Sequence, residues 1–127
     1  MLRKIVISAM FAITFPGLAS AEELLESYVA LLSSQDHFNS GGTRLTLPWQ
    51  IIRQDRANFH KFGKRDDLDE WDSFFGSIEN RAAAERMLAR GSISPGLSAK
   101  IVNGEVVIRV EIFGNGTKGT SLRVIVY

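Results

Sequence analysis

The segment 54–61, Gln-Asp-Arg-Ala-Asn-Phe-His-Lys, is the part of this chain richest in side chains that could do chemistry. In a helix, Asp55, Arg56 and His60 would lie within about one turn of each other, since residues three to five apart share a face. They could then form the floor of a polar pocket, in which Arg56 binds an anion and Asp55 orients His60 as an acid or base. The segment supplies no nucleophile, so a structural role is the favoured interpretation.

The apolar stripe of this helix is interrupted by charge at Asp55 and Arg56. An unpaired charge inside a protein is costly, so a charge at such a position must be paired or used. We therefore expect Arg56 to be partly buried and bonded to a carboxylate, with Asp55 or Asp66 as the partner. If the segment instead binds a partner, its surface would combine these polar groups with two flanking tryptophans. The candidate binding residues are Asp55, Arg56, His60, Trp49 and Trp71.

His37 is the only other histidine. Two histidines beside a cation could cleave RNA, one taking the 2′-hydroxyl proton and the other protonating the leaving oxygen. Two histidines are common in small proteins, however, so the pair alone favours no enzyme class. Zinc sites need clusters of His and Cys at set spacings, which His37 and His60 do not provide. The sequence predicts no metal site and no cofactor.

Acidic residues crowd into the segment 66–72 and suggest calcium. They are Asp66, Asp67, Asp69, Glu70 and Asp72. A calcium loop of the EF-hand type needs alternating oxygen ligands, a central glycine and a terminal glutamate, and this segment lacks that order. We favour a solvated acidic stretch that precedes a helix and complements its dipole. Gly41-Gly42 is no phosphate loop, because no strand precedes it and no Gly-Lys-Ser/Thr follows.

Three helices are expected to position these groups. Residues 22–34 carry leucines and Tyr28 at helical spacing behind three glutamates, which predicts an amphipathic helix. A second helix over 49–62 would follow Thr46 as its cap, with Pro48 in its first turn. Ser77 would cap a third helix to about residue 90, which Gly91 ends.

The C-terminal third alternates with a period of two, which is typical of strands. We expect a hairpin turn at Asn103-Gly104, strands before and after it, and a third strand over 120–127 beyond a turn at 114–119. One face of the middle strand is apolar and should contact the helices: Val106, Ile108, Val110 and Ile112. Arg109 and Glu111 should face water. The predicted fold is α+β, with about three helices followed by a three-stranded antiparallel C-terminal sheet.

The first 21 residues have the parts of a secretory signal peptide in order: a basic start, an uncharged apolar run and a small-residue box at 19–21. The apolar run is shorter than the roughly 20 residues that a membrane helix needs. We expect cleavage after Ala21 and a single exported domain over 22–127. With no cysteine in the chain, that domain has neither a disulfide nor a lipid-attachment site, which favours a periplasmic or secreted protein without a stable membrane anchor.

The charge balance argues against nucleic acid as a partner. The chain has 15 basic and 14 acidic residues, and removing Arg3 and Lys4 with the signal leaves 13 against 14. A nearly neutral domain has no overall electrostatic attraction for phosphate backbones. Asn115-Gly116-Thr117 is formally a glycosylation acceptor, but a Gly/Asn turn is the favoured interpretation.

The central third of the chain resembles a group of small, uncharacterised exported proteins of Gram-negative bacteria. The resemblance rests on residues 39–45, on 52–60, and on Arg65, Asp66 and Asp69. It implies a periplasmic address and carries no activity or catalytic residue.

We favour a non-enzymatic binding module for an unknown protein or envelope ligand, as a monomer or weak homo-oligomer. The alternative is a small hydrolase of phosphodiester or glycan bonds that uses His60, His37 or the acidic segment. A glycosidase would need two carboxylates about 5–10 Å apart in a cleft.

Overall fold

A computed structural model describes residues 22–90 and 93–127, so the predicted signal peptide lies outside the described residues. The elements, in chain order, are β1 (Glu23–Leu32), the 3-10 helix η1 (Ser34–His37), α1 (Pro48–His60), the 3-10 helix η2 (Phe74–Gly76), α2 (Ile78–Ala89), α3 (Pro95–Asn103), β2 (Val106–Asn115) and β3 (Lys118–Val126).

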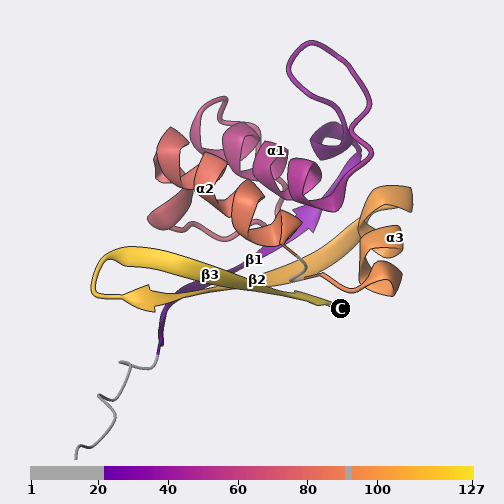
Figure 1. Cartoon of the computed structure of the whole chain (residues 1–127). Coiled ribbons are helices and arrows are strands. Elements are labelled where there is room, and N and C mark those ends of the chain that lie inside the picture. Colours follow the sequence, from indigo (N-terminus) through magenta and orange to yellow (C-terminus); the bar gives the residue numbers. More distant parts are fainter. Residues whose placement is uncertain (1–21, 91–92) are drawn as a thin grey trace, which may run out of the picture.

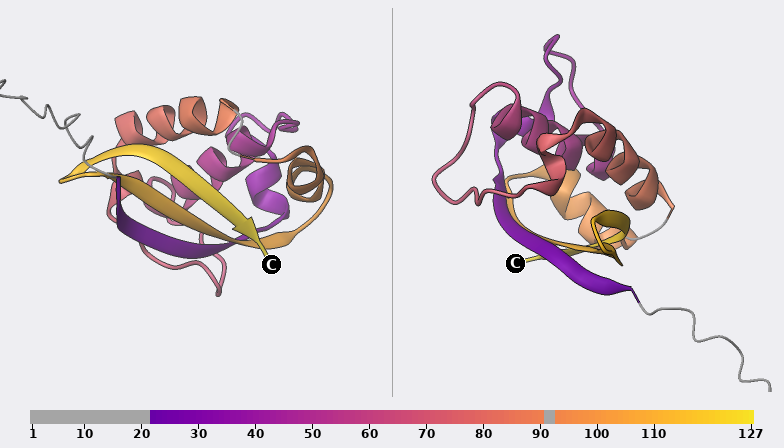
Figure 2. Two further views of the ribbon diagram at one scale, coloured as in Figure 1. Left: turned by 60° about the horizontal axis from the view of Figure 1, so that its bottom comes forward. Right: turned by 90° about the vertical axis from the view of Figure 1, so that its left-hand side faces the viewer.

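The three strands form one antiparallel sheet in the order β1-β2-β3, with β2 in the centre. Helices α1 and α2 lie together over one face of this sheet, and α3 stands at one end of it (Figure 1). In two further views, no helix formed by residues 22–90 or 93–127 covers the opposite face (Figure 2). The α+β class is therefore confirmed, with two layers around one core. Within the described residues no helix has the length and apolar character needed to span a bilayer.

The core lies between the sheet and the two covering helices. The predicted inward face of β2 is confirmed, because Ile108, Val110 and Ile112 are buried and Val106 packs beside them. Buried core residues also come from β1 (Tyr28, Ala30, Leu32), α1 (Ile51, Ile52), α2 (Ala84, Leu88), α3 (Ile101), β3 (Leu122, Val124) and η2 (Phe75).

The prediction that Glu111 faces water is wrong. It lies on the open face of the sheet, as alternation requires, but only 7% of it is exposed. Arg123 on the neighbouring strand lies opposite Glu111 and donates to Glu111 Oε1 through Nε, at 2.8 Å. Arg109 is half-buried and donates to Ser27 Oγ on β1.

The predicted helix over 22–34 is wrong, because this segment is strand β1. Its leucines satisfied a helical spacing, but the residues that are buried alternate: Tyr28, Ala30 and Leu32. Tyr28 lies opposite Val110, and Ala30 lies opposite Ile108, in an antiparallel ladder. This long-range pairing with the central strand buries the alternating set on the core side and overrides the local helical pattern. The sheet therefore takes its third strand from the start of the domain and not from its C-terminal third.

The predicted strand before Asn103-Gly104 is also wrong, because residues 95–103 form helix α3. Ser94 caps this helix by accepting from Leu97 N, and Pro95 occupies the first turn, where a missing N–H costs nothing. Asn103 ends the helix, and Gly104 leads extended into β2.

The other two helices are confirmed. α1 contains Pro48 in its first turn, although its N-cap is Leu47 and not Thr46. Ser77 caps α2 by accepting from Asn80 N. On α2, Ala84 and Leu88 are buried in the core. The hairpin turn predicted at Asn103-Gly104 is wrong, because these residues end α3. The turn predicted over 114–119 is confirmed, although it is limited to 116–117, where Gly116 has φ +61°.

The segment 61–73, which we call the edge loop, runs along the outer edge of β1. Its Asp69 and Glu70 carboxylates accept from the N–H groups of Leu31 and Val29, at 2.9 and 2.7 Å. Glu70 N donates in turn to Val29 O. The carboxylates of Asp69 and Glu70 thus take the place of carbonyl acceptors along the strand. The prediction of a solvated acidic stretch is wrong for Asp72, which is fully buried, whereas Asp67 and Glu70 are exposed.

Replacing Ile108 with alanine should lower the free energy of unfolding by about 2–5 kcal/mol, because its fully buried side chain would leave a cavity between the sheet and the helices. Chemical denaturation measures this loss. Ile125→Ala is the matched control, since Ile125 is half-buried on the open face and should cost clearly less. Equal losses in the two variants would show that the face assignment is wrong.

Candidate functional site

The guanidinium of Arg56 is fully buried at the centre of a polar cluster. Its Nε donates to Asp55 Oδ2 at 2.8 Å, and its Nη1 donates to Asp72 Oδ1 at 2.8 Å and to Glu70 O at 2.9 Å. The ring of Tyr28 on β1 lies 4.1 Å from its Cζ. The expectation that Arg56 is buried and bonded to Asp55 is confirmed, and the second carboxylate is Asp72, not Asp66.

The cluster places opposite charges in a water-excluded site. Burial raises the pKa of Asp55 well above its usual range, and the charge of Arg56 opposes this rise without cancelling it. Burial also acts to lower the pKa of Arg56, but the acidic groups of Tyr28, Asp55 and Asp72 outweigh it and hold that pKa above its usual range. Asp55 Oδ1 and Arg56 Nη2 have no hydrogen-bond partner among the described residues. The cluster is therefore an anchor within the fold, closed to a ligand.

His60 belongs to the same cluster through Asp72. Its Nε2 lies 2.8 Å from Asp72 Oδ1, while Asp72 Oδ2 accepts from Phe75 N at 2.6 Å. The His60 side chain is 11% exposed, and Asp72 is fully buried. A His–Asp pair of this kind can orient an imidazole, but catalysis would also need a nucleophile or a second acid or base at the histidine.

The remaining candidate residues do not converge on one open surface. Trp49, at the start of α1, is half-buried against the core. Trp71, in the edge loop, is 67% exposed. Asp55 and Arg56 are buried. The predicted segment thus separates into a buried anchor and two tryptophans with different surroundings.

His37 lies in a different network from His60. Its Nδ1 lies 2.7 Å from Ser33 O, and its Nε2 lies 2.8 Å from Ile101 O, so it ties η1 to α3. The two histidines share no hydrogen-bond partner among the described residues. In the part of the chain that the structure describes, no three His, Cys, Asp or Glu side chains gather in a way that could hold a metal ion.

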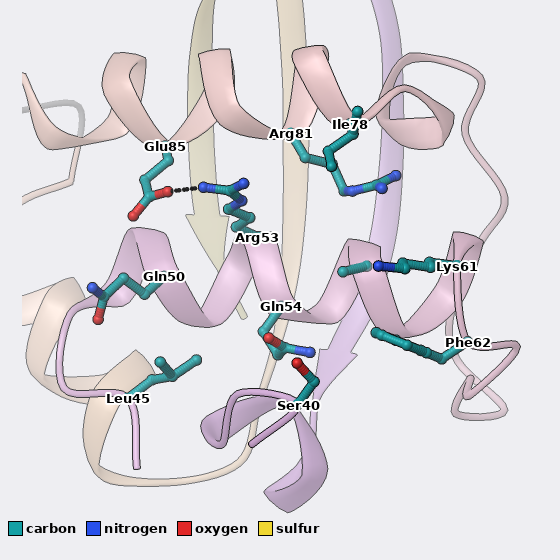
Figure 3. A pocket seen from close by; sticks show the side chains of 11 residues that line it. Ser40, Leu45, Gln50, Arg53, Gln54, Lys61, Phe62, Ile78, Arg81 and Glu85 are labelled. Carbon is teal, nitrogen blue, oxygen red and sulfur yellow. Dashed lines mark hydrogen bonds and ion pairs between the residues drawn. The ribbon is translucent and has the colours of Figure 1, made fainter. Parts of the chain in front are cut away.

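An open groove lies between α1, α2 and the 38–45 loop, and we call it the cationic groove. Its volume is about 310 Å³, and it is lined by Ser40, Leu45, Gln50, Arg53, Gln54, Ala57, Lys61, Phe62, Ile78, Arg81 and Glu85. Figure 3 shows Arg53 and Glu85 bridging the two helices, with Lys61 and Phe62 near the C-terminal end of α1. Three basic side chains and one carboxylate therefore line this groove.

Arg81 is the buried member of this groove. It is 6% exposed, and its Nη1 donates to Phe75 O at 2.7 Å. Burial lowers the pKa of Arg81, and the nearby positive charge of Arg53 lowers it further. Among the described residues no carboxylate forms an ion pair with Arg81. Two guanidinium groups thus repel each other beside a groove with one carboxylate, which is an arrangement that a bound anion would stabilise.

A second groove of about 260 Å³ adjoins the first, and we call it the amide groove. It shares Ser40, Gln54 and Phe62 with the cationic groove and is otherwise lined by Gln35, Phe38, Asn39, Gly42, Asn58 and Lys64. Its side chains are mostly amides and aromatic rings, with one more cation.

Neither groove was predicted from the sequence. Arg53, Gln54, Ala57 and Lys61 do repeat at helical spacing on one side of α1. That pattern is also typical of a solvated helix face, so it could indicate a site only once Arg81 and Glu85 of α2 were known to lie opposite.

Arg56→Ala should lower the free energy of unfolding by about 3–5 kcal/mol, because it leaves the carboxyl groups of Asp55 and Asp72 buried without their cation. Urea denaturation measures the effect. Arg86→Ala removes an exposed arginine of α2 and is the control, with an expected change within about 0.5 kcal/mol. A silent Arg56→Ala would contradict the anchoring role.

Asp36→Asn should weaken the dependence of stability on pH. Burial raises the pKa of Asp36 above its ordinary value of 3.8, against the hydrogen bonds from Asn58 and Ser33, which lower it. The unfolded chain therefore releases this proton at lower pH than the folded protein does. The stability that Asp36 contributes is full below the unfolded pKa and is lost as the pH rises through the folded pKa.

Urea unfolding between about pH 4 and pH 7 tests this expectation. The wild type should lose more stability over that interval than Asp36→Asn does. Asp67→Asn, in which an exposed aspartate of the edge loop is replaced, should keep the wild-type dependence. If Asp36→Asn also kept it, the proposed effect of burial would be wrong.

Comparison of the chain with protein-family models, with curated proteins and with solved structures returned no match. The function therefore has to be argued from the geometry of the two grooves and the buried cluster.

Proposed function

We propose that this protein is an exported, non-enzymatic binding module that takes an anionic ligand in the cationic groove. The exported, periplasmic address rests on the signal-peptide pattern of the first 21 residues. The binding role rests on the groove between α1, α2 and the 38–45 loop. This site replaces the one expected from the sequence, because Asp55 and Arg56 are buried in the anchor.

The main support for this proposal is the excess of basic side chains that line the two grooves. The cationic and amide grooves together are lined by Arg53, Lys61, Lys64 and Arg81, against the single carboxylate of Glu85. Over the domain 22–127, by contrast, acidic residues outnumber basic ones by 14 to 13. Basic side chains are thus concentrated where the surface is hollowed, which raises the local concentration of anions. Pockets that bind small ligands combine such concavity with a few convergent polar groups.

The position of Arg81 adds a structural reason. A guanidinium keeps its charge in proteins, so a buried one must be answered by hydrogen bonds or by a counter-charge. Arg81 donates to one backbone carbonyl; its charge is repelled by Arg53 and attracted by Glu79 and Asp72, but no described carboxylate forms an ion pair with it. Arg53 is already paired with Glu85, so an anion in the groove would supply a direct counter-charge to Arg81 in particular.

A hydrolase has weaker support. His60 is held by Asp72, His37 is held between two backbone carbonyls, and neither lines the cationic or the amide groove. In each of four pockets of the described chain, at most one carboxylate is part of the lining, whereas glycosidases use two.

Inorganic phosphate should bind this groove and shift the NMR signals of residues that line it. Arg81→Met should weaken binding by at least about tenfold, because hydrogen bonds to charged groups are worth about 1.5–3 kcal/mol. Lys61→Met should weaken binding by about two- to fivefold, as expected for an exposed charge.

Lys100→Met is the control for net charge, since Lys100 is exposed on α3 outside both grooves. Its phosphate affinity should match the wild type. Lys61 is exposed, so its replacement tests the groove even if Arg81→Met proves unstable. The proposal fails if phosphate causes no shifts in the groove, or if Lys100→Met weakens binding as much as Lys61→Met does.

A further inference from the structure

Gln54 lines both grooves, and hydrogen bonds to buried residues fix the orientation of its side-chain amide. Its Nε2 donates to Asn58 Oδ1 at 2.9 Å, and Asn58 Nδ2 donates to Asp36 Oδ1 at 2.9 Å. Asp36 and Asn58 are buried, so this chain of hydrogen bonds starts inside the protein. Because Asp36 accepts at Oδ1, the amide of Asn58 is oriented, and Asn58 in turn orients Gln54.

This relay leaves the Oε1 atom and one N–H of the Gln54 amide without a partner among the described residues. One of the two N–H groups of Nε2 is used on Asn58, and no described residue donates to Oε1. Figure 3 shows Gln54 extending from α1 towards Ser40, whose hydroxyl also belongs to both grooves. A ligand in the cationic groove therefore meets, next to the basic side chains, an acceptor that requires a hydroxyl or N–H donor.

An aromatic ring stands at the same junction. Phe62 lines both grooves and is 42% exposed. The ammonium groups of Lys61 and Lys64 lie 5.2 and 6.0 Å from its ring centroid, so an apolar surface and positive charge occur together. A pyranose ring matches this combination, because it has apolar C–H faces and hydroxyl groups at its edge.

We propose that the ligand is an acidic saccharide. Its anionic group lies among Arg53, Lys61 and Arg81, its ring packs on Phe62, and a hydroxyl donates to Gln54 Oε1. This inference rests on the anion-binding function proposed above and adds the chemical class of the ligand. The anion can be the carboxylate of a sugar acid or the phosphate of a sugar phosphate, since both accept hydrogen bonds from the same basic side chains.

Four probes separate the contributions: glucuronate, glucose 6-phosphate, inorganic phosphate and glucose. The affinities are measured by NMR titration of the wild-type protein. At least one of the two sugar anions should bind about tenfold or more tightly than both inorganic phosphate and glucose, since one added hydrogen bond with ring packing is worth about one factor of ten. The tighter of the two identifies the source of the anion.

Gln54→Ala and Phe62→Ala should each reduce the affinity for the preferred sugar anion by a larger factor than the affinity for inorganic phosphate, because both residues are proposed to contact the saccharide and not its anionic group. Phe62 is exposed enough for its replacement to leave the fold intact, which thermal melting checks. Asn103→Ala removes an exposed amide of α3 outside both grooves and should leave all four affinities unchanged.

The possible failures are distinct. If inorganic phosphate binds as tightly as the tighter-binding sugar anion, the saccharide inference is overturned and the anion-binding function stands. If glucose binds as tightly as the sugar anions, the anionic group is not what the grooves recognise, and both proposals are overturned. If none of the four probes binds, the function proposed above fails together with this inference.

Discussion

The guanidinium of Arg56 lies where α1, β1 and the edge loop meet, and it is fully buried. It donates to a carbonyl and a carboxylate of the edge loop, and it packs on the ring of Tyr28 of β1. Because a guanidinium keeps its charge, the edge loop cannot move away without leaving that charge unanswered inside the protein. This one group therefore fixes the position of the edge loop along β1. Lys61 and Phe62 begin the edge loop directly after α1, so their positions are fixed with it.

The fold class and the elements with strong local signals were predictable. Pro48 and Ser77 marked the starts of two helices, and alternation from Val106 to Ile112 marked the central strand and its buried face. Two elements were predicted wrongly, and the reasons differ. Residues 22–34 and 98–103 carry apolar residues that fit either period, and long-range pairing with β2 made the first of them a strand. For α3, Ser94 followed by Pro95 is a local signal for the start of a helix, but the prediction rested on the turn dipeptide at 103–104 and on the alternation beside it.

Only the part of the candidate site that depends on neighbouring residues in the sequence was predictable. A charge inside an apolar stripe must be paired, and this argument correctly gave a buried Arg56 bonded to its neighbour Asp55. The same argument could not identify Asp72 as the second partner of Arg56, because no local sequence pattern predicts that the edge loop folds back onto α1. The two grooves exist only because α2 lies against α1 and the 38–45 loop lies beside them. Residues such as Arg81 and Gln54 acquire a role from that arrangement and carry no motif of their own.

The use of carboxylates along β1 also bears on how molecules of this protein can associate. Val29 and Leu31 direct their N–H groups to the side chains of Glu70 and Asp69, so the acceptors there are charged and irregularly spaced. A strand from another molecule would have to displace them to extend the sheet at this edge, which blocks growth of a continuous sheet. Since β2 is the central strand, β1 is one of the two edges through which the sheet could be extended, and that edge is closed to such growth.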